Sequence, residues 1–162
     1  MLGSMALAAA TCLMPSCQTA QPEKPAPPAP LASSAKPTRV VPLADARDTD
    51  SNNRPDNLVL LVYLFRPEES AIPFWADGQF VFTLADARGS EMATWTFVRA
   101  QLPDHRTSDA LGPAHSFVLN LKEALGTDDL PAQAAALSAQ FIRTDGVTIA
   151  SSGPLSIPLG PR

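Results

Sequence analysis

The chain has 162 residues, among them 17 prolines, and a formal net charge of −4. That length suits one ordinary domain with additional segments. Nucleic-acid-binding proteins normally carry a basic face that neutralises phosphates, and no such face is visible here, so nucleic acid is not expected as a partner. The only cysteines, Cys12 and Cys17, precede the predicted domain, which fits an oxidising compartment outside the cytosol.

The first residues have the pattern of a secretion signal, predicted over residues 1–16. Residues 2–14, LGSMALAAATCLM, form an uncharged apolar run of suitable length, too short to span a bilayer. A normal signal also begins with Lys or Arg, and a start codon assigned too far downstream would explain why none is seen. The alternative is a disordered, alanine-rich start.

The sequence Met14-Pro15-Ser16-Cys17 resembles the lipobox of bacterial lipoproteins, although Leu is usual at the position of Met14 and proline is uncommon at the next position. The resemblance implies that the Cys17 thiol receives a diacylglyceryl group, that the signal is cut before Cys17, and that the new amino group is acylated. Two or more acyl chains hold a protein firmly to a membrane. We therefore expect a membrane anchor at Cys17, with Cys12 as a second candidate.

The expected location is the cell envelope, on the periplasmic or outer side. Gln18 resembles the outer-membrane sorting pattern of some lipoproteins, which favours the outer over the inner membrane. The alternatives for Cys17 are an ordinary cysteine in a cleaved or disordered leader, or a disulfide with Cys12, which would join nothing that folds.

Residues 17–57 are predicted to form a disordered linker. The stretch PEKPAPPAP favours extended polyproline II, and DARDTDSNNRPDN is small and polar without periodicity. Only RVVPL, residues 39–43, offers an early start for an edge strand. A flexible chain of about 40 residues reaches about 35 Å on average, which would let the domain search the space near a membrane.

Residues 58–162 are predicted to form a single antiparallel β-sandwich, transthyretin- or immunoglobulin-like, with six or seven strands; a small barrel is the alternative. All aromatic residues lie between 63 and 141, where a core must form. The run NLVLLVYLF (57–65) reads as a strand apolar on both faces. The runs GQFVFTLAD, ATWTFVR and HSFVLNL alternate with the period of two typical of half-buried strands.

The C-terminal part is expected to end in a hairpin and an edge strand. Asp145-Gly146 lies between two β-prone runs and predicts a type I′ turn. The preceding DDLPAQAAALSAQF contains good helix formers, but the hairpin needs a strand before its turn, so residues 135–143 are predicted as strand. PLSIPL, residues 154–159, is predicted as a last edge strand.

Two motifs only partly match known chemistry. Residues 48–53, DTDSNN, begin like a calcium-binding EF-hand loop, but Asn53 replaces the required glycine and Val59 the bidentate glutamate. Residues 33–36, SSAK, match the Ser-x-x-Lys pair of some acyl-transfer enzymes, but they lie in the predicted linker rather than in a folded pocket. We predict no metal, cofactor or catalytic residue from them.

His105 and His115 are the only histidines. Ten residues apart in PDHRTSDALGPAH, they match no recognised ligand spacing, so two surface-loop histidines are expected. The alternative is a secreted or tethered hydrolase that uses this loop.

Phe74 and Trp75 are adjacent in an expected connection. Neighbouring aromatic residues on a strand point to opposite faces, so one of them is a candidate for contact with a partner. The alternative is that both fold over the end of the sandwich. The outer face of the strand at 58–65 also allows two interpretations: it is covered either by loops of the same chain or by a partner chain.

The succession of LVLLVYLF, FWADGQFVFTLADARG, ATWTF, HSFVLNL and AQFIRTDGVTI after a tether resembles a group of uncharacterised bacterial lipoproteins with a sandwich domain. That group has no assigned activity, so the resemblance implies no functional residue. NNRPDNLVLLVYLF is also similar to the first strand of the type VI secretion lipoprotein, whose sandwich starts closer to its lipid. The expectation is a non-enzymatic binding, adaptor or structural module with an envelope protein as partner; the alternatives are a hydrolase or a type VI-like assembly lipoprotein.

Overall fold

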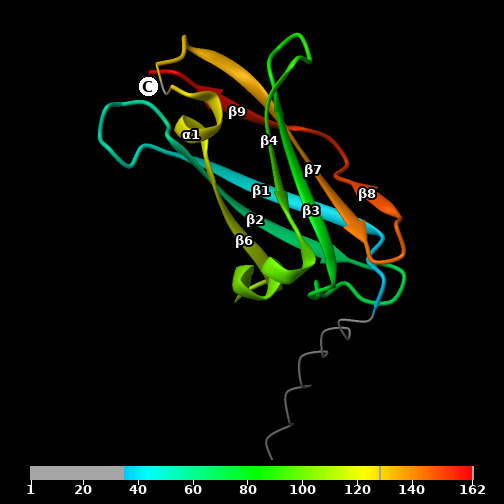
Figure 1. Ribbon diagram of the computed structural model, residues 1–162. Helices are drawn as coiled ribbons and strands as arrows, with labels where there is room; N and C mark the ends of the chain where they lie inside the picture. Colours follow the sequence, from blue (N-terminus) through cyan, green and yellow to red (C-terminus); the bar gives the residue numbers. More distant parts are fainter. Residues whose placement is uncertain (1–34, 128, 162) are drawn as a thin grey trace, which may run out of the picture.

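The structure, a computed structural model, describes residues 35–127 and 129–161, and these form two packed antiparallel sheets (Figure 1). The predicted all-β sandwich is therefore confirmed. The described residues contain nine strands: β1 (Arg39–Arg47), β2 (Asn57–Phe65), β3 (Gly78–Ala85), β4 (Glu91–Phe97), β5 (Arg106–Asp109), β6 (Gly112–Asn120), β7 (Gln133–Arg143), β8 (Thr148–Ala150) and β9 (Leu155–Leu159). A 3-10 helix, η1 (Arg99–His105), and a short helix, α1 (Leu121–Leu125), connect them.

The first sheet has the strand order β1-β2-β6-β5, and the second has the order β4-β3-β7-β8. Strand β9 also pairs with β7, next to residues 133–137, whereas β8 pairs with residues 140–142. The long strand β7 therefore has β3 on one side and two short strands in succession on the other.

Alternating apolar residues build the core, as the period of two in the sequence predicts. The largest buried side chains of β3, β6 and β7 are aromatic, and they come from both sheets. The ring of Phe117 in β6 lies 5.2 Å from Phe80, 5.1 Å from Phe82 and 4.5 Å from Phe97, measured between centroids. Phe117 thus joins the first sheet to two strands of the second.

The two long sides of the sandwich differ. On one side β1 lies against β8 and β9, with a parallel bridge between Val40 and Ser151 (Figure 1). On the other side the edge strand β4 faces β6, and no strand of the described residues lies between them. The sandwich is therefore closed along β1 and open along β4.

The domain begins earlier than the sequence suggested. β1 pairs with β2 over its whole length, from Arg39 opposite Phe65 to Arg47 opposite Asn57. The predicted linker over residues 17–57 is therefore wrong from Arg39 onward, and so is the boundary at residue 58. Small apolar side chains, those of Pro42 and Ala46 among them, face the core, and proline is tolerated because β1 is an edge strand.

The number of strands was also underestimated, since neither β1 nor the four-residue β5, which has no apolar residue, was counted. The strand at 135–143 and the edge strand near 154–159 are confirmed as β7 and β9.

The predicted type I′ turn is wrong, although the hairpin itself is confirmed. Gly146 donates its N–H to the Arg143 carbonyl at 2.9 Å and has a φ of 83°, whereas Asp145 is not among the residues with positive φ. A tight turn followed by one left-handed glycine is the usual three-residue hairpin connection, and it needs only one positive φ.

We predict that Gly78→Ala destabilises the domain by about 1–3 kcal/mol, the usual cost of overpacking. A Cβ at Gly78 would lie 2.5 Å from the carbonyl oxygen of Ile142 and closer still to the ring of Phe141. The measurement is the free energy of unfolding in urea. Gly153→Ala is the matched control, because nothing lies within 4 Å of the added carbon there. Equal stability of the two variants would contradict this prediction.

Candidate functional site

Part of the predicted site set lies outside the described residues. Cys17, the predicted lipidation site, is one of these, and so is Ser33 of the Ser-x-x-Lys match. Lys36 of the same match is described, and its Nζ lies 2.9 Å from a carboxylate oxygen of Asp145 in the β7–β8 turn. Lipidation of Cys17 therefore stays a prediction.

Phe74 and Trp75 pack over one end of the first sheet. Phe74 is only 1% exposed, and the Trp75 indole N–H donates to the carbonyls of Ala114 at 2.9 Å and Thr107 at 3.2 Å. The guanidinium of Arg106 lies over the Trp75 ring, 5.7 Å from its centroid. Phe74 therefore offers no surface to a partner, and it covers the end of the sandwich as the alternative describes. Trp75 is half-buried, and its contact with a partner stays a prediction.

The two histidines do not lie together in a surface loop, so this expectation is wrong. His115 belongs to β6 and is 0% exposed, and neither ring nitrogen has a hydrogen-bond partner among the described residues. His105 ends η1, and its Nδ1 donates to the Ser116 carbonyl at 3.0 Å. Both rings pack on Phe117, at 4.7 Å for His105 and 6.3 Å for His115.

Asp109 of the same segment is engaged with other groups than these rings. Asp109 accepts the Tyr63 hydroxyl at 2.5 Å and the Leu111 N–H at 2.9 Å. Burial and the neighbouring Asp109 carboxylate raise the pKa of Tyr63 to about 12. The hydrogen bond from the Tyr63 hydroxyl in turn lowers the pKa of Asp109. This network fastens β5 to β2, which gives the hydrolase alternative no support.

The DTDSNN loop is held by its own carboxylate. Asp48 accepts main-chain N–H groups from Ser51 at 2.7 Å, Asn52 at 3.2 Å and Asn53 at 2.7 Å. The described part of the chain contains no group of three or more His, Cys, Asp or Glu side chains placed to hold a metal. The loop is thus a turn that joins β1 to β2.

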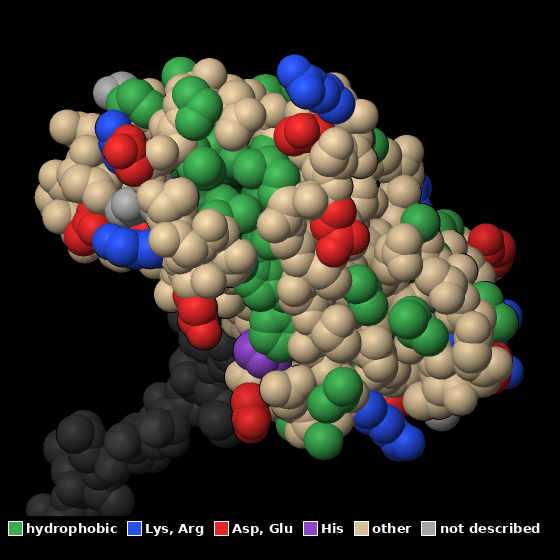
Figure 2. Space-filling model, turned by 45° about the horizontal axis from the view of Figure 1, so that its top comes forward, with side chains coloured by type: hydrophobic (Ala, Val, Ile, Leu, Met, Phe, Trp, Pro, Cys, Tyr) green, Lys and Arg blue, Asp and Glu red, His purple; other side chains and the backbone are tan. Residues whose placement is uncertain are grey.

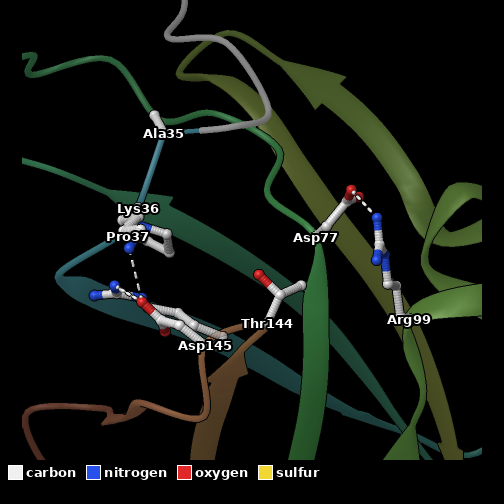
Figure 3. Close-up of a pocket in the computed structure, with 8 residues that line it drawn as sticks. Ala35, Lys36, Pro37, Asp77, Arg99, Thr144 and Asp145 are labelled. Atoms are coloured by element: carbon white, nitrogen blue, oxygen red, sulfur yellow. Dashed lines mark hydrogen bonds and ion pairs between the residues drawn. The ribbon is translucent and has the colours of Figure 1, made fainter.

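A pocket of about 140 Å³ at the end of the sandwich is lined with charges (Figure 3). Asp145 is ion-paired with Lys36 and Arg143, which lowers its pKa to about 2, and Arg99 lies 2.9 Å from Asp77. Because these positive charges already face carboxylates, the pocket is a structural junction and not a ready site for an anion.

The open side of the sandwich holds a hollow in the surface, which we call the interaction groove. It has a volume of about 390 Å³ and is lined by Thr94, Trp95, Val118, Asn120, Glu123 and Ala124. Figure 2 shows hydrophobic side chains gathered in a hollow on this face, with a histidine at one end.

One wall of the groove is the free edge of β6. Leu121 donates its N–H to the Asp56 carbonyl at 2.8 Å. Because main-chain groups alternate in direction along a strand, the other odd-numbered residues at this end of β6 also direct theirs toward β2. Val118 and Asn120 therefore direct theirs to the other side. β5 pairs only with residues 112–115, so it does not reach them.

The opposite wall is the free edge of β4. Ser151 donates its N–H to the Ala139 carbonyl at 2.8 Å, so the main-chain groups of Ala139 point away from β3. Because these directions alternate along each strand, Phe82, which lies opposite Ala139, directs its main-chain groups to β4, where they pair with Trp95. The N–H and C=O groups of Thr94 and Thr96 then point away from β3, to the free edge. Both walls thus offer main-chain donors and acceptors to an extended chain.

Trp95 is the aromatic residue in the groove lining, and Phe97 continues the same inner face of β4. Trp95 and Phe97 face inward from β4 and are half-buried, and the Phe97 ring lies 4.9 Å from His105 and 4.5 Å from Phe117. Such a groove can bury apolar side chains of an extended peptide while the strand edges in its walls pair with the main chain of that peptide. The sequence does not predict this groove, because the alternation that identifies β4 as a strand does not show that β4 lies at the edge of its sheet.

A comparison with known proteins finds no match for this chain: no family model, no curated protein and no solved structure is similar enough. Among the described residues, no helix is both long and apolar enough to cross a membrane.

We predict that His115 makes the domain less stable in acid. Burial, with the positive charges of Arg106 and His105, lowers the pKa of His115 from 6.5 to about 4. The unfolded chain therefore binds more protons between these values, and the free energy of unfolding falls as the pH drops from about 6.5 to about 4. The pKa difference corresponds to about 3 kcal/mol, measured by urea unfolding across this range.

The control for the acid effect is a pair of variants. His115→Leu should flatten the pH dependence in this window, whereas His105→Gln should keep most of it. An unchanged slope in the His115→Leu variant would assign the acid sensitivity to other groups.

Proposed function

We propose that this protein is a lipid-anchored lipoprotein of the bacterial envelope whose β-sandwich is a non-enzymatic binding module. The anchor is Cys17, as the lipobox resemblance implies, and the outer membrane is the favoured location. The ligand is an extended peptide segment of an envelope protein, bound in the interaction groove. The single observation that supports binding most strongly is this groove, with two free strand edges beside the aromatic side chain of Trp95.

The chemistry of the groove favours peptide binding over catalysis. An extended segment can add as a strand beside β4, taking up the unused main-chain groups of Thr94 and Thr96, while its alternate side chains contact Trp95 and Phe97. The pairing supplies affinity, and these aromatic side chains select apolar side chains at every second position. The residues that line the groove include one carboxylate, Glu123, and no second acid or base.

The anchor is tested by metabolic labelling with a clickable fatty acid in a bacterial host, using the native gene with its upstream region. Label on the native chain and none on Cys17→Ala is expected, because the thiol is the acceptor in the resembling family. Cys12→Ala should keep the label and serves as the control. Equal labelling of native chain and Cys17→Ala, or none on either, would contradict the anchor.

The groove is tested by crosslinking in cells with a photoreactive residue at Ala124, which lines it. Thr96→Pro removes one free N–H of β4 without touching the bonds to β3, so it should block strand addition and abolish the crosslinked product. Thr96→Val keeps the N–H and should keep the product. The same photoreactive residue at Val147, exposed on the β7–β8 turn, is the position control.

Two results would refute the groove as the binding site. One is a product that survives Thr96→Pro when the variant is still folded by its thermal unfolding. The other is an identical product from position 147. Labelling of Cys17 tests only the anchor, so the two parts of the proposal fail separately.

A further inference from the structure

Three connections between strands each present a large apolar side chain to solvent. Val98 lies between β4 and η1, Leu111 in the β5–β6 turn, and Val147 in the β7–β8 turn. Their exposed fractions are 46%, 64% and 47%. Single exposed apolar residues are normal at a protein surface, so the significance of these three depends on where they lie together.

The strand registers place the three connections at the same end of the sandwich. In the second sheet, β4 and β7 both end at the level where β3 begins, at Gly78. In the first sheet, β5 runs toward its turn in the direction in which β2 ends, at Phe65. Residues 66–77 connect β2 to β3, so these two sheet ends form one end of the molecule (Figure 1).

The described chain also begins at this end. The Nζ of Lys36 lies 2.9 Å from the Asp145 carboxylate in the β7–β8 turn, and Arg39 at the start of β1 lies opposite Phe65. All that precedes Ala35 in the sequence is therefore joined to the end that carries the three apolar side chains. We call it the entry end.

The two ends of the sandwich differ in charge. At the opposite end, the described residues of 45–57, 86–91 and 121–129 include eight acidic and four basic residues. At the entry end, residues 36–39, 66–77, 99–109 and 143–147 include six of each. An anionic lipid surface therefore repels the opposite end and leaves the entry end free to approach.

The three apolar residues also have main-chain donors that are already satisfied within their own turns. The N–H of Val98 donates to the side-chain oxygen of Gln101 at 2.9 Å. The N–H of Leu111 donates to Asp109 at 2.9 Å, and that of Val147 donates to the aspartate of its own turn at 3.4 Å. Insertion of these side chains among lipid headgroups therefore removes none of these three N–H groups from a partner, a loss that would oppose insertion.

We propose that the entry end is a membrane-contacting surface, with Val98, Leu111 and Val147 inserted into the headgroup layer of a lipid bilayer. This contact rests on the Cys17 anchor proposed above and adds an orientation to it. Three apolar side chains bind a bilayer only weakly by themselves. An anchor joined to the same end keeps them at a high local concentration beside the lipid, where a weak contact is enough.

The consequence is a domain that stands on the membrane with its binding site accessible. Three residues of the interaction groove, Asn120, Glu123 and Ala124, lie at the last residue of β6 and in α1, toward the opposite end. The groove then opens to the side, above the lipid surface, where an extended segment of an envelope protein can enter it.

The test uses the full chain with Cys12→Ser, coupled through Cys17 to a maleimide phospholipid. The vesicles contain phosphatidylethanolamine, phosphatidylglycerol and a fluorescent phospholipid. A photoreactive residue replaces either Leu111 or Ala87, an exposed residue of the β3–β4 turn at the opposite end. Position 111 is expected to give about tenfold more fluorescent lipid adduct than position 87, because only the entry end faces the lipid.

A second variant tests whether the apolar side chains act together. Val147→Asp should lower the lipid adduct at position 111 several-fold, because it places a carboxylate against the anionic surface. Leu43→Asp, a control of similar exposure (49%) on the outer face of β1, should leave the adduct unchanged.

Four outcomes would overturn the proposal. They are no lipid adduct at position 111, equal adducts at positions 111 and 87, an adduct at 111 that survives Val147→Asp, and a dominant adduct between two protein chains at 111. Because Cys17 is coupled chemically, the measurement does not depend on lipidation in cells. A failure of fatty-acid labelling and a failure of membrane contact are therefore distinguishable.

Discussion

The packing of Phe117 between the sheets is the contact on which the rest of this structure depends. Its ring touches aromatic side chains of β3 and β4 and both histidines. The two sheets are therefore joined at the middle by a buried cluster, which leaves their edges free to differ. Aromatic pairs of this kind add to the energy of burial, so the sandwich does not need strands along both sides to hold together.

The difference between the two sides follows from that central joint. Along β1 the sides meet, and Val40 bridges to Ser151. Along β4 they part, because β5 stops at Arg106 and does not extend beside residues 116–120 of β6. His105 then covers one carbonyl, that of Ser116, and the main-chain groups beyond it open into the groove. A short strand, more than any single side chain, creates the candidate site.

The sequence predicts most of the strands well, but it predicts poorly which strands lie next to one another in the sheets. Alternation in GQFVFTLAD and HSFVLNL identifies β3 and β6, since one face of each is buried. β1 was difficult to recognise because its inward positions are small and include Pro42, which reads as linker. His115 is the first residue of the predicted strand HSFVLNL, yet its burial was missed, because nothing local shows that β6 begins three residues earlier, at Gly112. The groove depends on which strand ends a sheet, and no pattern within β4 carries that information.

Edge strands are usually protected by lysine, proline, bulges or a covering segment. β1 fits that rule, with Pro42 in the strand and β8 and β9 beside it. From Met92 to Phe97, β4 has neither lysine nor proline, and its only irregularity is the register shift opposite Ala85. Threonines line its outer side and aromatic residues its inner side. An unprotected edge above an apolar floor can pair with an extended chain, and this is the physical argument behind the peptide binding proposed for the groove.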